Sequence, residues 1–311
     1  FEADAETHDN PVTLVTGIAR GRDPWLLDDA GLLTHLRELE VRLPTLEEAG
    51  AKVGIGVATG ADKVYVRHKD DIDIEPERTL PLAMGRDLTV DGVEWSGKVL
   101  VNPWTMAGTL ADLAEFPRFR AYLESHKSKL TARHTAKKSP ARWYKTIDKV
   151  HGDLTAKPKL LIPDIKGNAM IVYDEGRYYP HHNLYVVTAE GWDLRALQAL
   201  LRSSVGMMFV AAYSVRMAGG FLRFQAQYLR RIRVPHWKDL DDSQRYALVS
   251  VAASLEQEAV DEAAFDAYEL STPARIAVRN FADSARVASP QKLRGRSNSA
   301  SRGKMTPLIE N

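Results

Sequence analysis

The chain has 311 residues, 44% of them hydrophobic, and its 42 basic and 41 acidic side chains leave a net charge of +1. This length and composition suffice to bury a hydrophobic core in one large or two smaller domains, which excludes an intrinsically disordered protein. Cysteine is absent, which excludes disulfides, thiolate zinc sites and a cysteine nucleophile, and agrees with the cytoplasmic location that we expect.

No apolar run approaches the ~20 residues that span a bilayer, so we expect no membrane contact. The sequence opens with FEADAETHDN, which is acidic and does not begin with Met. We therefore expect a processed product or a fragment of a longer polypeptide rather than a secreted protein.

Short β-rich runs bounded by Gly, Pro or Asp dominate the first half of the chain. They predict strands at residues 12–16, 53–58, 63–67, 79–84 and 98–101. Two helices are predicted between them, one at about residues 28–40 and one that starts near Pro117. The apolar face of the second helix has a helical spacing and consists of Phe119, Tyr122, Leu123, His126 and Leu130.

The second half alternates between strands and helices. Strands are predicted at residues 159–163, 169–174, 184–188 and 231–235, and helices at residues 193–202 and 205–216. Residues 239–270 are rich in Ala, Glu and Leu and begin with Asp and Ser, which can cap a first turn, so they predict a helical appendage.

The segment beyond Phe281 is rich in Ser, Arg and Gly, and predicts a disordered, mildly basic tail. We therefore expect an α+β fold of mixed and antiparallel sheets of short strands with packed helices. It would comprise a main domain at residues 1–237, the helical appendage at 238–281 and the tail at 282–311.

Residues 126–151 form a basic block with eight Lys and Arg side chains and a single acid, Asp148. Trp143 and Tyr144 lie within it, and cations beside flat rings can hold a polyanion and stack on its bases. The alternative is a solvated helix end, whose cations complement the helix dipole and whose aromatic rings belong to the core. The block makes nucleic acid the first partner to test.

Residues 54–60, GIGVATG, have the glycine content of a nucleotide-binding loop. In such loops the glycines follow a strand and open a helix, whereas residues 61–66 here have the pattern of a second strand. We therefore predict a β-hairpin with a turn at residues 59–62, in which Gly60 has a positive φ angle. The N–H groups of this turn, together with Lys63, are candidate phosphate contacts.

Asn102-Pro103-Trp104-Thr105 can be compared with the Asn/Asp-Pro-Pro-Tyr/Phe loop that holds a flipped base in amino-group DNA methyltransferases. The second proline and the fourth-position aromatic are both missing. We interpret this segment as the end of a strand.

His181-His182 are a candidate pair of metal ligands. Adjacent residues of a strand point to opposite faces, and no acid or cysteine has ligand spacing near them in the sequence. We therefore predict a hydrogen-bonded turn and no metal site.

Residues 216–224 place Arg216 and Arg223 on either side of the pair Gly219 and Gly220. Arginine is suited to guanine edges and phosphates, and glycines allow close backbone approach. The alternative is a glycine turn that ends a helix and carries surface arginines.

The order of several weak motifs resembles the C-terminal target-recognition domain, or TaqI-like specificity domain, of adenine-specific DNA methyltransferases and fused restriction-modification enzymes. The motifs extend over about residues 15–270. They are GIGVATGADKVYV at 54–66, RWY at 142–144, KPKLLIPDI at 157–165, NLY at 183–185, LLRS at 200–203, GGFLR at 219–223 and YLRRIRVP at 228–235. Where the family usually has Asn in the first motif this chain has Asp62, which would repel a phosphate.

The resemblance implies a module that reads double-stranded DNA and follows an N-terminal catalytic domain in the same polypeptide. That domain would use S-adenosyl-L-methionine to methylate adenine, while this chain alone would hold no catalytic residue, cofactor or metal. The expected DNA contacts are Thr59, Gly60, Lys63, Arg133, Lys137, Lys138, Arg142, Trp143, Tyr144, Lys145, Lys149, Arg216, Gly219, Gly220 and Arg223.

Two other classes of function stay open. The first is a self-contained enzyme that binds S-adenosyl-L-methionine or a nucleotide at the 54–60 loop. The second is a protein-interaction domain that binds its partner through the helical appendage.

Overall fold

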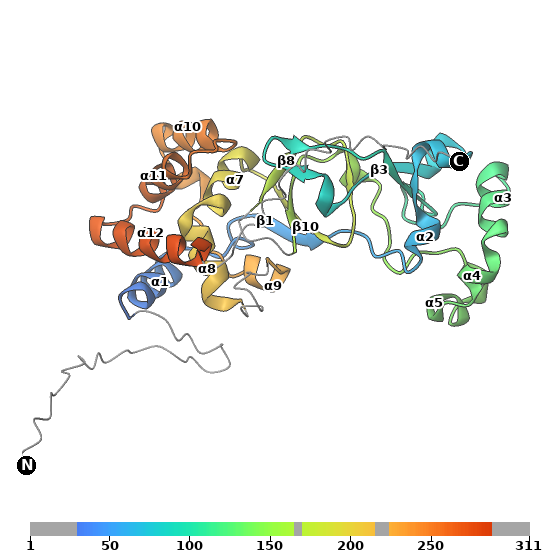
Figure 1. Ribbon diagram of the computed structural model, residues 1–311, viewed down its shortest axis with the longest axis horizontal. Helices are drawn as coiled ribbons and strands as arrows, with labels where there is room; N and C mark the ends of the chain where they lie inside the picture. The colour runs from blue at the N-terminus through green and yellow to red at the C-terminus, as the bar shows by residue number, and fades with distance from the viewer. Residues whose placement is uncertain (1–29, 165–169, 215–223, 288–311) are drawn as a thin grey trace, which may run out of the picture.

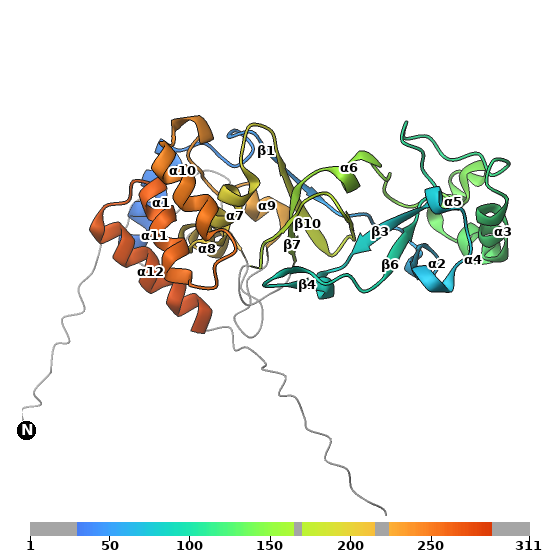
Figure 2. The same cartoon turned by 90° about the horizontal axis from the view of Figure 1, so that it is seen from above.

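Figure 1 shows the computed structural model of the chain, which describes residues 30–164, 170–214 and 224–287. The elements are arranged along one long axis. Long helices gather at one end, two four-stranded sheets lie next to them, and short helices form the other end (Figures 1 and 2). This arrangement confirms the expected α+β class.

The first sheet has the strand order β1-β10-β7-β8, and every neighbouring pair is antiparallel. Its strands are β1 (Ala51–Ile55), β7 (Lys159–Pro163), β8 (Val172–Asp174) and β10 (Leu184–Ala189). Val53 is paired with Val187, and both side chains are buried. The face that they share therefore packs against the helical end.

The helical end surrounds the largest hydrophobic core of the described residues. Its helices are α1 (Ala30–Arg42), α7 (Leu194–Arg202), α8 (Ser204–Tyr213), α9 (Ala226–Leu229), α10 (Asp242–Val251), α11 (Gln257–Ala267) and α12 (Thr272–Val287). α8 is apolar on all sides and buried on nearly all of them, as expected for a central helix. Asp241 caps α10 through a reciprocal pair of hydrogen bonds with Gln244, which confirms the predicted helix start.

No single helix among the described residues is long and apolar enough to cross a membrane. The bent pair α7 and α8 reaches the required length and composition only when the two helices are taken together, across a bend of 61°.

The second sheet has the order β2-β6-β3-β9, with β9 parallel to β3. Its strands are β2 (Val66–His68), β3 (Thr79–Ala83), β6 (Lys98–Val101) and β9 (Tyr179–Pro180), and a small ribbon of β4 (Leu88–Thr89) and β5 (Gly92–Val93) lies apart from it. The short helices of this end are α2 (Asp62–Tyr65), α3 (Pro117–Ser125), α4 (Lys127–Thr131), α5 (His134–Lys137) and α6 (Asp153–Ala156). A second core, which includes Tyr65, Leu100 and Phe119, holds this end together.

Gly56 and Val57 connect the two sheets. The N–H of Gly56 donates to the carbonyl of Leu184 in the first sheet, and the N–H of Val57 donates to that of Pro180 in the second. A Cβ atom at residue 56 would lie 2.2 Å from the carbonyl oxygen of His181. Only glycine fits this crossing, so Gly56 allows close backbone packing between the two sheets.

Several sequence predictions are wrong in detail. The predicted hairpin does not form, because β1 pairs with β10 and β2 pairs with β6, and residues 62–65 are one helical turn rather than a strand. Residues 231–235 form no strand, and Arg233 makes only an isolated bridge to Thr45. The long helix after Pro117 breaks at His126 into α3 and α4.

The other predicted elements agree with the structure to within a few residues where the structure describes them, and β6 and β7 agree at both ends. The strand predicted at residues 12–16 lies outside the described residues, as does the tail beyond 287. Helices α10 to α12 share the core of α1, α7 and α8, and α12 continues through residue 281 to Val287. The predicted appendage therefore has no separate core.

Candidate nucleic-acid interface

The end of the molecule that carries α2, α4 and α5 has a surface of exposed cations, which we call the basic end. Its members lie on α2, α4, α5 and the loop that follows, and they are Lys63, Lys129, Lys137, Lys138, Arg142 and Lys149, with the half-buried Lys145 beside them. Within the described residues none of these seven side chains forms an ion pair with an acid, whereas Lys127 pairs with Glu124 at 2.9 Å. These charges are therefore available to an anion in solution.

A cleft of about 550 Å³ opens within the basic end. Residues 58–64 form one part of its lining, and Lys129, Ile147 and His182 contribute the rest. Lys63 and Lys129 thus lie at one concave surface, although 66 positions separate them in the sequence.

Gly60 has the predicted positive φ angle of 71°, and it is exposed at the cleft. A side chain here would meet Ile147 at 2.7 Å from its Cβ. The turn therefore favours glycine for its backbone conformation, whereas the exposed Ile147 side chain could move aside for a Cβ atom.

Arg133 differs from the lysines because its guanidinium is half-buried and engaged with the backbone. Its Nε donates to the carbonyl of Leu130, its Nη1 to Thr59, and its Nη2 to Trp143 and Lys145, at 2.8 to 3.2 Å. Four of its five N–H groups are thus used inside the protein. The geometry makes Arg133 a tie that holds three segments of the basic end together.

Thr59 is buried and also engaged internally. Its hydroxyl donates to Asp62 at 2.5 Å and accepts from the N–H of Ala61 at 3.0 Å. Its carbonyl accepts from Arg133 and, at 3.3 Å, from the N–H of Ile147. The structure therefore gives Thr59 the task of orienting Asp62.

Trp143 and Tyr144 are half-buried and pack against the second core. The Tyr144 hydroxyl donates to the carbonyl of Ala111 at 2.9 Å, and burial raises its pKa. The Nζ of Lys127 lies 5.1 Å from the centre of the Trp143 ring. Both rings thus contribute to packing, which leaves less of their surface free to stack on a base than the sequence suggested.

Asn102 is buried at the end of β6, where a strand end was predicted. Its side-chain oxygen accepts from the N–H of Trp104 at 2.9 Å, and the Trp104 indole donates to Thr146. Both side chains are buried and hydrogen-bonded inside the protein.

Arg216, Gly219, Gly220 and Arg223 lie outside the described residues. Of the cleft residues, Lys129 and Asp62 are absent from the predicted contacts, and His182 was considered as a metal ligand and rejected. Lys129 was visible in the basic block, whereas no spacing in the sequence relates Asp62 to His182.

The comparisons with known proteins agree with this organisation. Residues 80–234 match the TaqI-like C-terminal specificity domain. The chain therefore belongs to the family of proteins that contain this domain.

Among its relatives, the type II methyltransferase M.XhoI of Xanthomonas vasicola is 52% identical over 268 residues, which cover 86% of this chain and 49% of that protein. M.PaeR7I of Pseudomonas aeruginosa is 50% identical over 268 residues, covering 86% and 47%. The chain thus spans about half the length of the curated relatives that it matches. Among solved structures, the Type IIL restriction-modification enzyme MmeI in complex with DNA matches with a TM-score of 0.51 and 13% identity, over 76% of this chain and 35% of that one, which supports the fold alone.

Proposed function

We propose that this chain is the DNA-recognition module of a type II adenine-specific DNA methyltransferase. The observation that carries the proposal is the basic end, where exposed cations without acid partners surround a cleft. Phosphate contacts by such side chains supply most of the affinity for duplex DNA and set its register. The relatives at 50% identity or more are type II methyltransferases, which gives the electrostatic surface a specific context.

Within this proposal, Lys63, Lys137, Lys138, Arg142, Lys145 and Lys149 contact phosphates, and Lys129 joins them at the cleft. The turn at Gly60 approaches the DNA backbone closely. Arg133 and Thr59 support these contacts from inside, and Trp143 and Tyr144 hold the loop in place.

The pair Gly219 and Gly220 with Arg216 and Arg223 is proposed as a second contact region, and its support is the sequence alone. Helices α8 and α9, which flank it in the chain, lie on the opposite side of the first sheet from α2, α4 and α5 (Figures 1 and 2).

The methyl transfer itself is assigned to a catalytic domain outside this chain, which would bind S-adenosyl-L-methionine and a flipped adenine. The chain matches only about half of each relative, so a further domain of that size is consistent with the comparison. A cytoplasmic location follows from the role, because cellular DNA in bacteria lies there.

The first test is selection from a pool of randomised duplexes at two salt concentrations, followed by sequencing of the bound fraction. Enrichment of one motif at the higher salt is the expected result, since base contacts persist when phosphate contacts weaken. Absence of binding at both concentrations would contradict the proposal. Binding of S-adenosyl-L-methionine by this chain alone would instead favour a self-contained enzyme.

A second test removes one cation. Lys138→Ala should weaken binding to every duplex by about eightfold at 0.1 M salt and reduce the salt slope by ~0.9, the value for one phosphate contact. Lys238, an exposed lysine at the helical end, is the matched control. Equal losses in Lys138→Ala and Lys238→Ala would contradict the assignment to the basic end.

A further inference from the structure

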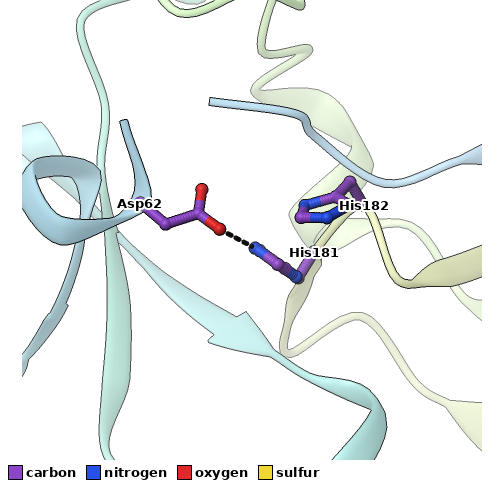
Figure 3. Close-up of side chains that lie close together, drawn as sticks. All are labelled: Asp62, His181 and His182. Carbon is purple, nitrogen blue, oxygen red and sulfur yellow. Dashed lines mark hydrogen bonds and ion pairs between the residues drawn. The ribbon is translucent and has the colours of Figure 1, made fainter. Parts of the chain in front are cut away.

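Asp62, His181 and His182 come together at the cleft. Their nearest ligand atoms all lie within 4.8 Å of one another, and Figure 3 shows the carboxylate and the two rings converging. The carboxylate comes from α2, whereas the histidines follow β9, 119 positions later. The expectation that adjacent histidines point apart is wrong here, because their ring centres are 4.0 Å apart in a turn beyond the end of the strand.

The hydrogen bonds of His181 indicate that its neutral form faces Asp62 with a lone pair. The side-chain oxygen of Asn183 accepts from the N–H of Gly85 at 3.3 Å, which fixes the orientation of that amide. Since the same oxygen lies 3.2 Å from His181 Nδ1, Nδ1 must carry a proton and donate to it. In the neutral ring Nε2 then has no proton, and it lies 3.2 Å from the carboxylate Oδ2 of Asp62.

Two acceptors that face each other at 3.2 Å repel unless a proton or a metal ion lies between them. Ligand atoms around a tetrahedral zinc ion are ~3.4 Å apart, given metal–ligand distances of ~2.0–2.2 Å. The gap between Nε2 and Oδ2 therefore has the width that such an ion requires.

The outer contacts of the group are also those of a metal site. Ligating histidines characteristically donate their other N–H to an oxygen, as His181 does to Asn183, and ligating carboxylates are hydrogen-bonded in turn, as Asp62 is to Thr59. His182 is exposed at the cleft, so its ring can rotate to supply the third ligand.

We propose that Asp62, His181 and His182 bind one divalent transition-metal ion, with Zn²⁺ as the best fit. Two imidazoles and one carboxylate suit Zn²⁺ or Co²⁺ and do not suit Mg²⁺, which prefers oxygen ligands. Asp62 and His182 line the cleft together with Lys63 and Lys129, so a coordination position that the protein leaves free takes water or an anionic oxygen from the cleft. The ion also converts the one acid of the cleft from a group that repels anions into part of a site that attracts them, and it links the two chain segments that join the sheets. This inference does not depend on DNA binding.

The test uses the chain without tag histidines, freed of metal with a chelator and then titrated with Co²⁺. Visible absorption reports nitrogen and oxygen ligation of the ion, and calorimetry with Zn²⁺ gives the stoichiometry. We expect one ion per chain, displaced by Zn²⁺ and unaffected by excess Mg²⁺. Absence of saturable binding, or displacement of Co²⁺ by Mg²⁺, would overturn the proposal.

Variants assign the ion to its ligands. Asp62→Ala and His182→Ala change exposed side chains, so the fold should persist. Each should weaken metal binding at least tenfold, because loss of a residue that only supports a ligand already weakens binding by about that much. His68→Ala is the matched control, because His68 lies 3.4 Å from Asp70 but no third ligand is near in the described residues. Unchanged binding in Asp62→Ala and His182→Ala, or an equal loss in His68→Ala, would contradict the assignment.

Thr59 is a positioning residue for this site. Thr59→Val keeps the shape of the buried side chain but removes the hydroxyl that orients Asp62. This variant should weaken binding of the metal ion by roughly tenfold. Thr59→Ser retains the hydroxyl and should restore binding. Equal affinity in the Val and Ser variants would assign Thr59 a purely structural role and remove it from the site.

Discussion

Replacement of Arg133 tests whether its side chain contacts DNA or acts as an internal tie that holds the segments of the basic end together. Arg133→Ala removes four hydrogen bonds to backbone carbonyls, as well as the contact of the guanidinium with the Tyr65 ring at 5.5 Å. Hydrogen bonds from a charged donor contribute about 1.5–3 kcal/mol each, but carbonyls near the surface regain water when the donor is lost. We therefore expect the free energy of unfolding to fall by about 3 kcal/mol, roughly the value of one to two such bonds.

The assay is urea unfolding, with Arg142→Ala as a control that removes an exposed arginine from the same loop. Arg142→Ala should change the unfolding free energy by less than about 0.5 kcal/mol. Arg133→Lys keeps the charge but lacks the planar fork that spans the carbonyls, so it should recover less than half of the loss. A stable Arg133→Ala variant with weaker DNA binding, rescued by Arg133→Lys, would refute the role of an internal tie.

Two further predictions concern charged groups that stabilise the fold. Glu75 accepts the N–H groups of Arg118 and Phe119 at the start of α3; burial raises its pKa, but these bonds and the Arg118 charge outweigh that effect and lower it. The stabilising contribution of the Glu75 carboxylate is therefore fully present above pH 4.5, the ordinary pKa of glutamate, and is lost as the pH falls through the lowered pKa. Glu75→Gln should lower the free energy of unfolding by about 1 kcal/mol at pH 7. It should also flatten the pH dependence of that free energy, measured by urea unfolding at pH 7 and pH 4. Lys159 is fully buried and lies 2.6 Å from Asp174, so Lys159→Met should lower the unfolding free energy by roughly 3–5 kcal/mol. The double variant Lys159→Met with Asp174→Asn should lose less stability, because it no longer buries a carboxylate without its ion-pair partner. An equal loss in the double variant would show that this carboxylate is not the cause.

The sequence predicted the elements that local patterns determine. β6 and β7 are apolar runs closed by proline or by Asn-Pro, and the cap of α10 follows from Asp241 and Gln244, which lie three residues apart. The hairpin prediction failed because pairing is not local. Residues 53–58 and 63–67 have the patterns of adjacent strands. The backbone of Gly56, however, passes so close to the carbonyl of His181 that no other residue fits there. This crossing directs the two segments into different sheets.

The candidate site was predictable to the same limited extent. Clustered lysines were visible because they are close in sequence, and their exposure follows from their chemistry. The engagement of Arg133 and Thr59 was not visible, because their partners are backbone atoms brought near by folding. The three-residue group at the cleft was missed for the same reason, since Asp62 precedes the histidines by more than a hundred residues.

The two large cores of this molecule have no residue in common. Substitutions that remodel the basic end must keep the packing around Tyr65, Leu100 and Phe119, but they do not disturb the packing of α7, α8 and α12. In evolutionary terms, the surface proposed to read DNA can diverge while the helical end stays constant. Chimeras that exchange the chain between the Gly56 crossing and β7, together with β9, are therefore the natural units for engineering new recognition.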